Sequence, residues 1–278
     1  MGRRIVVRSV GEARASFAAS GVGSMLVPMW TWAVLGAAAV ALLLVTALTA
    51  ARPAGPVPDR DGYFDRWAAT HGGFDPRGNR WAGGWLTVAY GLARPLARWG
   101  VKPDVLTVWT VLIAGVVAAL ATEGGRWPVA AGVLVVTSGL GDAVDGAVAV
   151  LTDRTTRWGY VLDSLVDRVN DLLYVAAVWL IGAPAWLVAG TAVGILLLEY
   201  VRARGNNAGA GEIGVVTVGE RPSRVIACAV TLLAAGVAPA ASAEIAAAGL
   251  GVLAALTLVG LAQILVAVHR ALRPESTG

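Results

Sequence analysis

Four aspartates stand at helical spacing in a chain that is otherwise largely apolar. Asp142 and Asp145 are three residues apart, and Asp163 and Asp167 are four apart. On a helix, either spacing places both carboxylates on one face, about one turn apart. The short segment TDRTTRW between the pairs predicts antiparallel neighbouring helices whose acidic faces converge. Each charge at bilayer depth costs about 2.5–3.5 kcal/mol on insertion scales, so the four carboxylates require cations or a polar cavity.

The chemistry open to these carboxylates is that of a hard divalent cation. The two histidines, His71 and His269, lie in different regions, and Cys228 is the single cysteine, so a site rich in imidazole or thiolate is excluded. Converging carboxylates suit Mg²⁺ or Mn²⁺. Two such ions about 3.5–4 Å apart could clamp a diphosphate. We therefore expect one or two ions, with ligands drawn from Asp142, Asp145, Asp163 and Asp167.

The composition is that of a bilayer protein. Of the 278 residues, 57% are hydrophobic and only 14% are charged, and the mean hydropathy is +0.69. Soluble domains carry about 25% charged residues. The 22 Lys+Arg exceed the 18 Asp+Glu, which in a membrane protein indicates cytoplasmic loops and contact with anionic lipid. No basic run with interleaved aromatic residues is present, so we expect no nucleic-acid partner.

Seven apolar stretches predict an all-α, polytopic membrane helix bundle, with a six-helix core and an additional N-terminal hydrophobic segment. They cover residues 30–50, 104–122, 128–151, 160–181, 184–204, 222–240 and 244–268.

The region ahead of the core divides in two. Residues 85–100 are amphipathic and predict an interfacial helix on the membrane surface, with a solvated linker helix as the alternative. Residues 52–83, rich in Gly, Pro, Asp and Arg, are expected to form a loop. The predicted domains are an N-terminal hydrophobic segment and polar linker at 1–83, the interfacial helix at 84–102 and the membrane domain at 103–270.

The placement of arginine predicts the orientation in the cell membrane. Nearly all the bases lie in the segments 51–103, 152–158, 202–224 and 269–273. By the positive-inside rule these segments and the nearby aspartates face the cytoplasm. The leader disagrees, because it places Arg3, Arg4, Arg8 and Arg14 before an expected uncleaved anchor at 30–50. Either that anchor does not cross fully, or the eight bases of the following loop determine the orientation.

The aspartates belong to a longer pattern. The run Asp142-x2-Asp145-Gly146-x2-Ala149-x9-Gly159-x3-Asp163-x3-Asp167 closely resembles the signature of the CDP-alcohol phosphotransferase family. The resemblance extends over about residues 100–270. It implies six membrane helices preceded by an interfacial helix, a homodimer, and transfer of a substituted phosphate from a CDP-linked donor, commonly CDP-diacylglycerol, to an alcohol with release of CMP.

The resemblance also implies roles for single residues. Asp142, Asp145 and Asp163 would hold the metal, and Asp167 would be the general base on the acceptor hydroxyl. One position departs, because the family usually has an arginine, associated with the donor, where this chain has Val150. Arg154 and Arg157 in the following loop are candidate replacements. The expected donor-binding residues are therefore Asp142, Gly146, Ala149, Arg154, Arg157 and Gly159.

Four arginines predict the acceptor site. Arg202, Arg204, Arg221 and Arg224 surround a glycine-rich loop, and the planar guanidinium fork suits phosphate. The segment resembles family members with phosphorylated acceptors, notably the phosphatidylinositol phosphate synthases. Glycerol 3-phosphate, inositol phosphate and phosphatidylglycerol all stay open. The alternative is that these are ordinary positive-inside loop charges. Separately, Glu199 is expected to pair with one of these arginines.

Other interpretations of the aspartates stay open. A cation- or proton-coupled transporter would also carry intramembrane carboxylates, although a transport site is expected near the midplane rather than at one membrane face. A catalytically inactive family member acting as a membrane binding protein would account for Val150. The aspartates could also be helix-end charges that pair with Arg154, Arg157 and Arg168.

Overall fold

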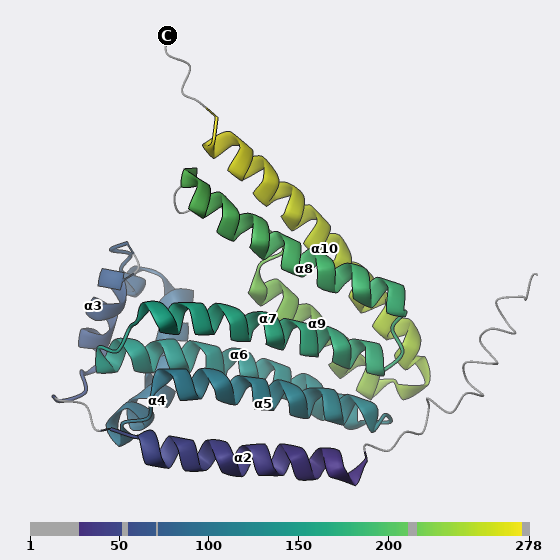
Figure 1. Ribbon diagram of the computed structural model, residues 1–278, viewed down its shortest axis with the longest axis horizontal. Helices are drawn as coiled ribbons and strands as arrows, with labels where there is room; N and C mark the ends of the chain where they lie inside the picture. The colour runs from purple at the N-terminus through teal and green to yellow at the C-terminus, as the bar shows by residue number, and fades with distance from the viewer. Residues whose placement is uncertain (1–27, 52–54, 71, 211–215, 274–278) are drawn as a thin grey trace, which may run out of the picture.

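The computed structural model describes residues 28–51, 55–70, 72–210 and 216–273, so the basic leader lies outside the described residues. All regular elements in these ranges are helical, which confirms the predicted all-α bundle (Figure 1). Each of the seven apolar stretches corresponds to one helix. The helices are α2 (Met29–Thr49), α3 (Arg60–Thr70), α4 (Arg80–Trp99), α5 (Pro103–Thr122), α6 (Trp127–Thr152), α7 (Arg157–Leu180), α8 (Ala185–Gly205), α9 (Arg221–Val237) and α10 (Ser242–Ala271).

Five helices are long and apolar enough to cross a membrane: α2, α5, α6, α8 and α10. The other two helices of the bundle differ for visible reasons, since α9 has only 17 residues and α7 carries the second pair of aspartates. The chain is thus a multi-pass membrane protein. Its alternating helix directions bring the connections that carry arginine to one end of the bundle, which we call the arginine end (Figure 1).

The core is built from small and branched side chains. Ala114, Ala131, Ala177 and Ala235 are fully buried between α5, α6, α7 and α9. Small residues let membrane helices approach closely, because lipid supplies little hydrophobic driving force between helices. Close packing of these four helices brings the acids of α6 and α7 onto adjoining faces.

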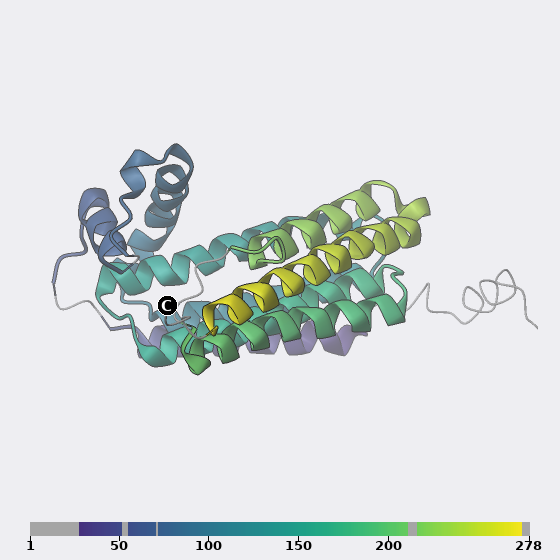
Figure 2. The same cartoon turned by 90° about the horizontal axis from the view of Figure 1, so that it is seen from above.

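Helices α8 and α10 pack on each other and diverge from α7 toward the arginine end (Figures 1 and 2). They stay joined to α7 at the other end, where Gly182 takes a left-handed φ of 119° and the Ser242 hydroxyl donates to the Ile181 carbonyl at 2.9 Å. The divergence leaves room between α7 and α8 near the acids.

Helices α3 and α4 cover the arginine end of α6 (Figure 2). The expectation of a loop over 52–83 is wrong, because α3 lies within it. Asp59 begins α3 by accepting from the Gly62 amide at 2.9 Å, which satisfies a free N–H of the first turn. Tyr63 is 1% exposed and its ring stacks on Tyr90. Burial raises the pKa of Tyr63 to about 12, so this hydroxyl stays neutral.

Helix α4 confirms an amphipathic helix ahead of the core, although it begins at Arg80 rather than near residue 84. Its inner face, including Leu86 and Ala93, packs on α6. Its outer face exposes Trp81, Trp85 and Trp99, and amphipathic indoles suit the membrane–water boundary. That α4 lies on the membrane surface stays a prediction.

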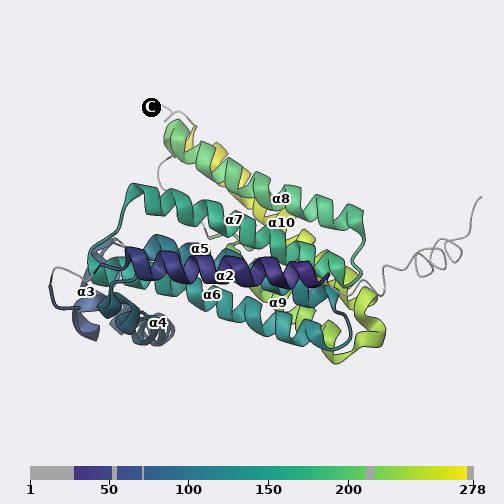
Figure 3. The same ribbon diagram turned by 60° about the horizontal axis from the view of Figure 1, so that its bottom comes forward.

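Helix α2 runs along the outside of α5 (Figure 3). Hydrogen bonds tie the two helices at both ends: the Trp32 indole donates to Glu123 at 3.2 Å, and the Trp109 indole donates to the Thr46 hydroxyl at 3.2 Å. None of its residues is buried. The N-terminal hydrophobic segment is therefore a full-length helix antiparallel to α5.

Candidate active site

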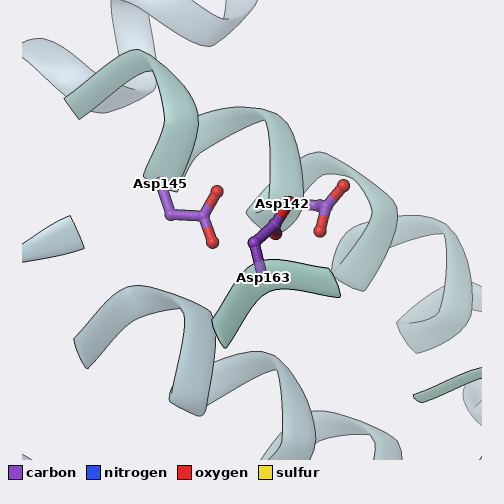
Figure 4. Close-up of side chains that lie close together, drawn as sticks. All are labelled: Asp142, Asp145 and Asp163. Carbon is purple, nitrogen blue, oxygen red and sulfur yellow. The ribbon is translucent and has the colours of Figure 1, made fainter. Parts of the chain in front are cut away.

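Three of the predicted acids come together at the arginine end. Asp142 and Asp145 on α6 and Asp163 on α7 point toward one another (Figure 4). Each offers a carboxylate oxygen, and these oxygens lie within 4.8 Å of one another. The Oδ1 atom of Asp142 is buried without a hydrogen-bond partner. A buried, unpaired carboxylate oxygen is costly unless a cation binds it, so the three residues fit a divalent ion.

Asp145 is held in place by neighbours on its own helix and on α5. Its Oδ2 accepts from the Thr107 hydroxyl at 2.6 Å, and its Oδ1 accepts from the Gly146 amide at 2.6 Å. Both Asp145 and Thr107 are 5% exposed. Thr107 therefore orients a metal ligand through its second oxygen, a contact that the sequence did not single out.

Asp167 lies beside the three acids and faces α9. Arg221 forms an ion pair with Asp142 and lies 2.9 Å from the Asp167 Oδ1 through its Nη2. Arg168 adds a longer contact to Asp167 at 3.6 Å. Asp167 was predicted both as a ligand and as the base. In this structure it stands outside the three-residue cluster, at the boundary with the acceptor side.

A cavity of about 250 Å³ opens on the other side of the cluster, which we call the motif cavity. Beyond Gly146, a Cβ would meet no atom within 4 Å, so this glycine leaves the cavity open to a bulky ligand. Four of the six predicted donor residues line it, and Asp142 and Arg157 do not. The lining residues are Pro103, Asp104, Thr107, Asp145, Gly146, Ala149, Arg154, Thr155, Thr156, Gly159, Tyr160 and Asp163.

The loop between α6 and α7 is shaped by two turns. Asp153 ends α6 in a left-handed conformation with φ 53°, and Thr156 begins α7 by accepting from the Gly159 amide at 2.9 Å. Between them, Arg154 turns to the motif cavity, whereas Arg157 is exposed. The predicted alternative, in which the aspartates pair with Arg154, Arg157 and Arg168, holds in part: Arg168 contacts Asp167 at 3.6 Å, whereas neither loop arginine forms an ion pair with these acids among the described residues. Arg221 is the main partner.

Val150 is 8% exposed within the hydrophobic cluster of α3, α4 and α6. Arg66 on α3 donates to the carbonyls of Val150 and Leu151 at 3.5 and 3.3 Å, in the last turn of α6. An arginine at position 150 would have to enter this apolar cluster. Val150 is therefore part of the packing of α3 on α6 and does not line the motif cavity.

A cavity of about 570 Å³ lies between α7 and α8, which we call the arginine cavity. Three of the four predicted acceptor arginines line it, whereas Arg204 is exposed and lies outside it. Arg168 also lines this cavity, although it was not among the predicted acceptor residues. Its position directly after Asp167 could have indicated that it lies near the site. The lining residues are Tyr160, Ser164, Asp167, Arg168, Leu196, Glu199, Tyr200, Arg202, Ala203, Asn206, Glu220, Arg221 and Arg224.

Acidic residues hold these arginines in place. Glu199 contacts Arg168 at 2.6 Å and Arg224 at 2.8 Å, which confirms that it pairs with an acceptor-side arginine. Arg224 is 2% exposed and also lies 3.4 Å from Asp171. The interpretation of these arginines as ordinary solvated loop charges is therefore wrong for Arg224.

An apolar groove of about 670 Å³ runs between α6 and α9 under Trp85 of α4. Its walls include Val136, Leu140 and Ile226, and one end reaches Asp142, Asp167 and Arg221. The groove suits a hydrocarbon chain whose polar head lies at the acids.

Fold and site together define a class: an all-α membrane protein with a carboxylate cluster that fits a divalent ion, beside two cavities lined by polar residues and one apolar groove. Residues 101–272 match the CDP-alcohol phosphatidyltransferase family. The chain belongs to this family. It is a CDP-alcohol phosphotransferase that depends on a divalent metal ion, Mg²⁺ or Mn²⁺, and uses a CDP-linked alcohol as donor and a second alcohol as acceptor.

Curated relatives carry related names. The archaetidylinositol phosphate synthase of Aeropyrum pernix is 36% identical over 145 residues, which cover 50% of this chain and 72% of that protein. The phosphatidylinositol phosphate synthase of Cutibacterium acnes is 33% identical over 151 residues, which cover 50% of this chain and 70% of that protein.

Solved structures share the fold. The phosphatidylinositol phosphate synthase of Mycobacterium tuberculosis with CDP-DAG bound is 24% identical, with a TM-score of 0.57, and the match covers 68% of this chain and 99% of that one. The same enzyme in complex with manganese and citrate is 25% identical, again with a TM-score of 0.57, over 68% of this chain and 93% of that one.

Proposed function

We propose that the enzyme transfers a phosphatidyl group from CDP-diacylglycerol to an alcohol that already carries a phosphate, with inositol phosphate as the first candidate. One observation carries this proposal: Asp167 and Arg221 line the arginine cavity, and Arg221 also pairs with Asp142 of the three-acid cluster. A phosphorylated acceptor bound by these guanidinium groups would place a hydroxyl beside Asp167. The names of the relatives support the same acceptor class.

Each side of the site has a distinct task. Asp142, Asp145 and Asp163 hold the divalent ion, which neutralises charge on the donor diphosphate and on departing CMP. The motif cavity receives the cytidine diphosphate part of the donor, and the apolar groove receives its acyl chains. Asp167 takes the proton of the acceptor hydroxyl as the hydroxyl oxygen bonds to the phosphatidyl phosphorus. At the same time the bond from that phosphorus to the CMP oxygen breaks, and CMP leaves.

We further propose that the protein lies in the cell membrane with its site on the cytoplasmic side, because the connections that carry arginine gather at the same end as the acids. A homodimer stays a prediction from the family resemblance. Light scattering of the detergent complex, corrected for bound detergent, measures it.

The test is release of CMP from CDP-diacylglycerol by the purified protein in detergent. Mg²⁺ or Mn²⁺ is supplied, with inositol phosphate, glycerol 3-phosphate, phosphatidylglycerol and unphosphorylated inositol as acceptors. We expect release that requires metal and a phosphorylated acceptor, and that falls by about 10²–10⁴-fold in Asp167→Asn, the usual range for losing a general base. If CMP is released with unphosphorylated inositol and with none of the phosphorylated acceptors, the proposal of a phosphorylated acceptor is wrong. No release with any acceptor would favour the inactive binding protein.

A further inference from the structure

We propose that α2 contributes to donor binding by orienting Arg154, although α2 lies outside the matched family region. The inference rests on the proposed function, since it assigns the donor's phosphate as the anion that Arg154 binds. Arg154 Nη2 donates to the backbone carbonyl of Ala51 at 2.9 Å. Ala51 is the second residue after the end of α2 at Thr49.

The other amino group of Arg154 is available to a ligand. Nη1 is buried and has no hydrogen-bond partner in the described part of the chain. Leaving a charged donor buried and unpaired is costly, so this geometry favours an incoming acceptor atom. Arginine presents its N–H groups in a rigid fork, so fixing Nη2 on Ala51 also fixes the direction of Nη1.

The surroundings indicate which acceptor atom that is. Among the described residues that line the motif cavity, Arg154 is the only base, and Asp145 and Asp163 of the acidic cluster line the same cavity. A ligand held by an ion at these carboxylates must itself be anionic near the ion. The donor's diphosphate meets both requirements, and a guanidinium group binds phosphate with charge-assisted hydrogen bonds.

The carbonyl that orients Arg154 is itself fixed from two sides. The Ala51 amide donates to the Gly100 carbonyl at 2.9 Å, which ties the end of α2 to the end of α4. One turn earlier, Thr46 accepts from the Trp109 indole of α5. A segment outside the family region thus completes a position in the donor site.

The first experiment measures binding of CDP-diacylglycerol, without acceptor, to the full-length protein in detergent with Mn²⁺. We expect Arg154→Gln to weaken donor binding about tenfold or more and Arg154→Lys to restore only part of it. Mn²⁺ affinity and thermal stability should stay at the wild-type level, which a variant that failed to fold would not do. Arg126→Gln, an exposed arginine at the opposite end, is the matched control.

The second experiment tests the part played by α2. Ala51→Pro removes the amide that bonds to Gly100 and keeps the carbonyl, and Ala50 already has ψ 127°, which suits a residue before proline. We expect Ala51→Pro to weaken donor binding in the wild-type background and to have no further effect when combined with Arg154→Gln.

The outcomes separate this inference from the proposed function. Additive effects of the two substitutions, or wild-type donor affinity in Arg154→Gln, would overturn it. A larger loss in Arg157→Gln than in Arg154→Gln would overturn it too, by making the exposed loop arginine the donor ligand. Failure of the wild-type protein to release CMP would instead contradict the proposed function, whatever the donor affinity.

Discussion

The acids of the site differ in how their side chains are oriented. Asp145 is fixed by hydrogen bonds from the Thr107 hydroxyl and the Gly146 amide. Asp142 and Asp167 instead share the guanidinium of Arg221. Groups that orient a metal ligand through its other oxygen commonly affect metal affinity by 10–100-fold. Thr107 therefore deserves the same experimental scrutiny as the ligands themselves.

We predict that Thr107→Val lowers the affinity for Mn²⁺ by about 10–100-fold while leaving the fold intact. Valine has nearly the shape of threonine but cannot donate to the Asp145 Oδ2, so the carboxylate loses its fixed direction. Electron paramagnetic resonance of free Mn²⁺ during a titration measures the affinity directly.

Thr122→Val is the control for this prediction. Thr122 lies at the opposite end of the same helix, and its hydroxyl donates only to the Ala119 carbonyl. Equal Mn²⁺ affinities for the Thr107 and Thr122 variants would mean that Thr107 packs beside the site without orienting Asp145.

The spacing of the acids predicted at the residue level that all four aspartates would converge. The structure brings Asp142, Asp145 and Asp163 together and leaves Asp167 beside them. Spacing could not predict that Arg221 pairs with Asp142, because that contact depends on how α9 packs against α6. For the same reason, it could not separate Arg154, which lines the motif cavity, from Arg157, which does not. Contacts between distant segments follow from tertiary packing rather than from local pattern.

At the scale of the element, a glycine inside α6 lowers the stability of the helix and leaves space for a cavity. Gly146 sits in the interior of α6, and open space lies where its Cβ would be. Glycine in a helix interior costs about 1 kcal/mol relative to alanine. This destabilising glycine lies where the motif cavity meets the backbone of α6.

Gly146→Ala should therefore stabilise the protein and weaken donor binding at the same time. The methyl group would meet no protein atom but would project into the motif cavity, where we place the donor's diphosphate. We expect the free energy of unfolding to rise by up to about 1 kcal/mol and the KM for CDP-diacylglycerol to increase. Thermal unfolding in detergent and steady-state kinetics measure the two effects.

Gly251→Ala is the matched control, because its Cβ would also meet open space, within α10 and away from the cavities. It should share the gain in stability and leave the KM for the donor unchanged. An unchanged KM in Gly146→Ala as well would remove the donor from this part of the cavity.

The long helices could be predicted because hydropathy and length mark them directly. Helix α3 could not be predicted in the same way, since its residues 60–70 are polar and include Gly62. A local signal was nevertheless present: Asp59 precedes the helix as a cap, and Tyr63, Phe64 and Trp67 recur at helical spacing. The overall composition of residues 52–83 did not indicate this helix, because it combines the short helix with the turns on either side.

At the scale of the whole molecule, ion pairs hold the arginine end together. Helices α7 and α8 diverge there (Figure 1), and the arginine cavity lies between them. Arg224 on α9 bridges this gap by contacting Asp171 on α7 and Glu199 on α8. The same contacts that shape the arginine cavity thus join three helices.

We predict that Arg224→Ala destabilises the folded protein by about 3–5 kcal/mol, because it removes a partner of the buried Asp171 and of the half-buried Glu199. Thermal unfolding in detergent measures the loss, with Arg204→Ala, an exposed arginine outside the cavity, as control. Arg224→Ala combined with Asp171→Asn should recover part of the stability, since the buried carboxylate that lost its partner is then neutral, while Glu199 keeps Arg168. Recovery would show that the charge pairing, rather than the volume of the arginine, joins α9 to α7. A double variant as unstable as Arg224→Ala alone would instead assign that role to side-chain packing.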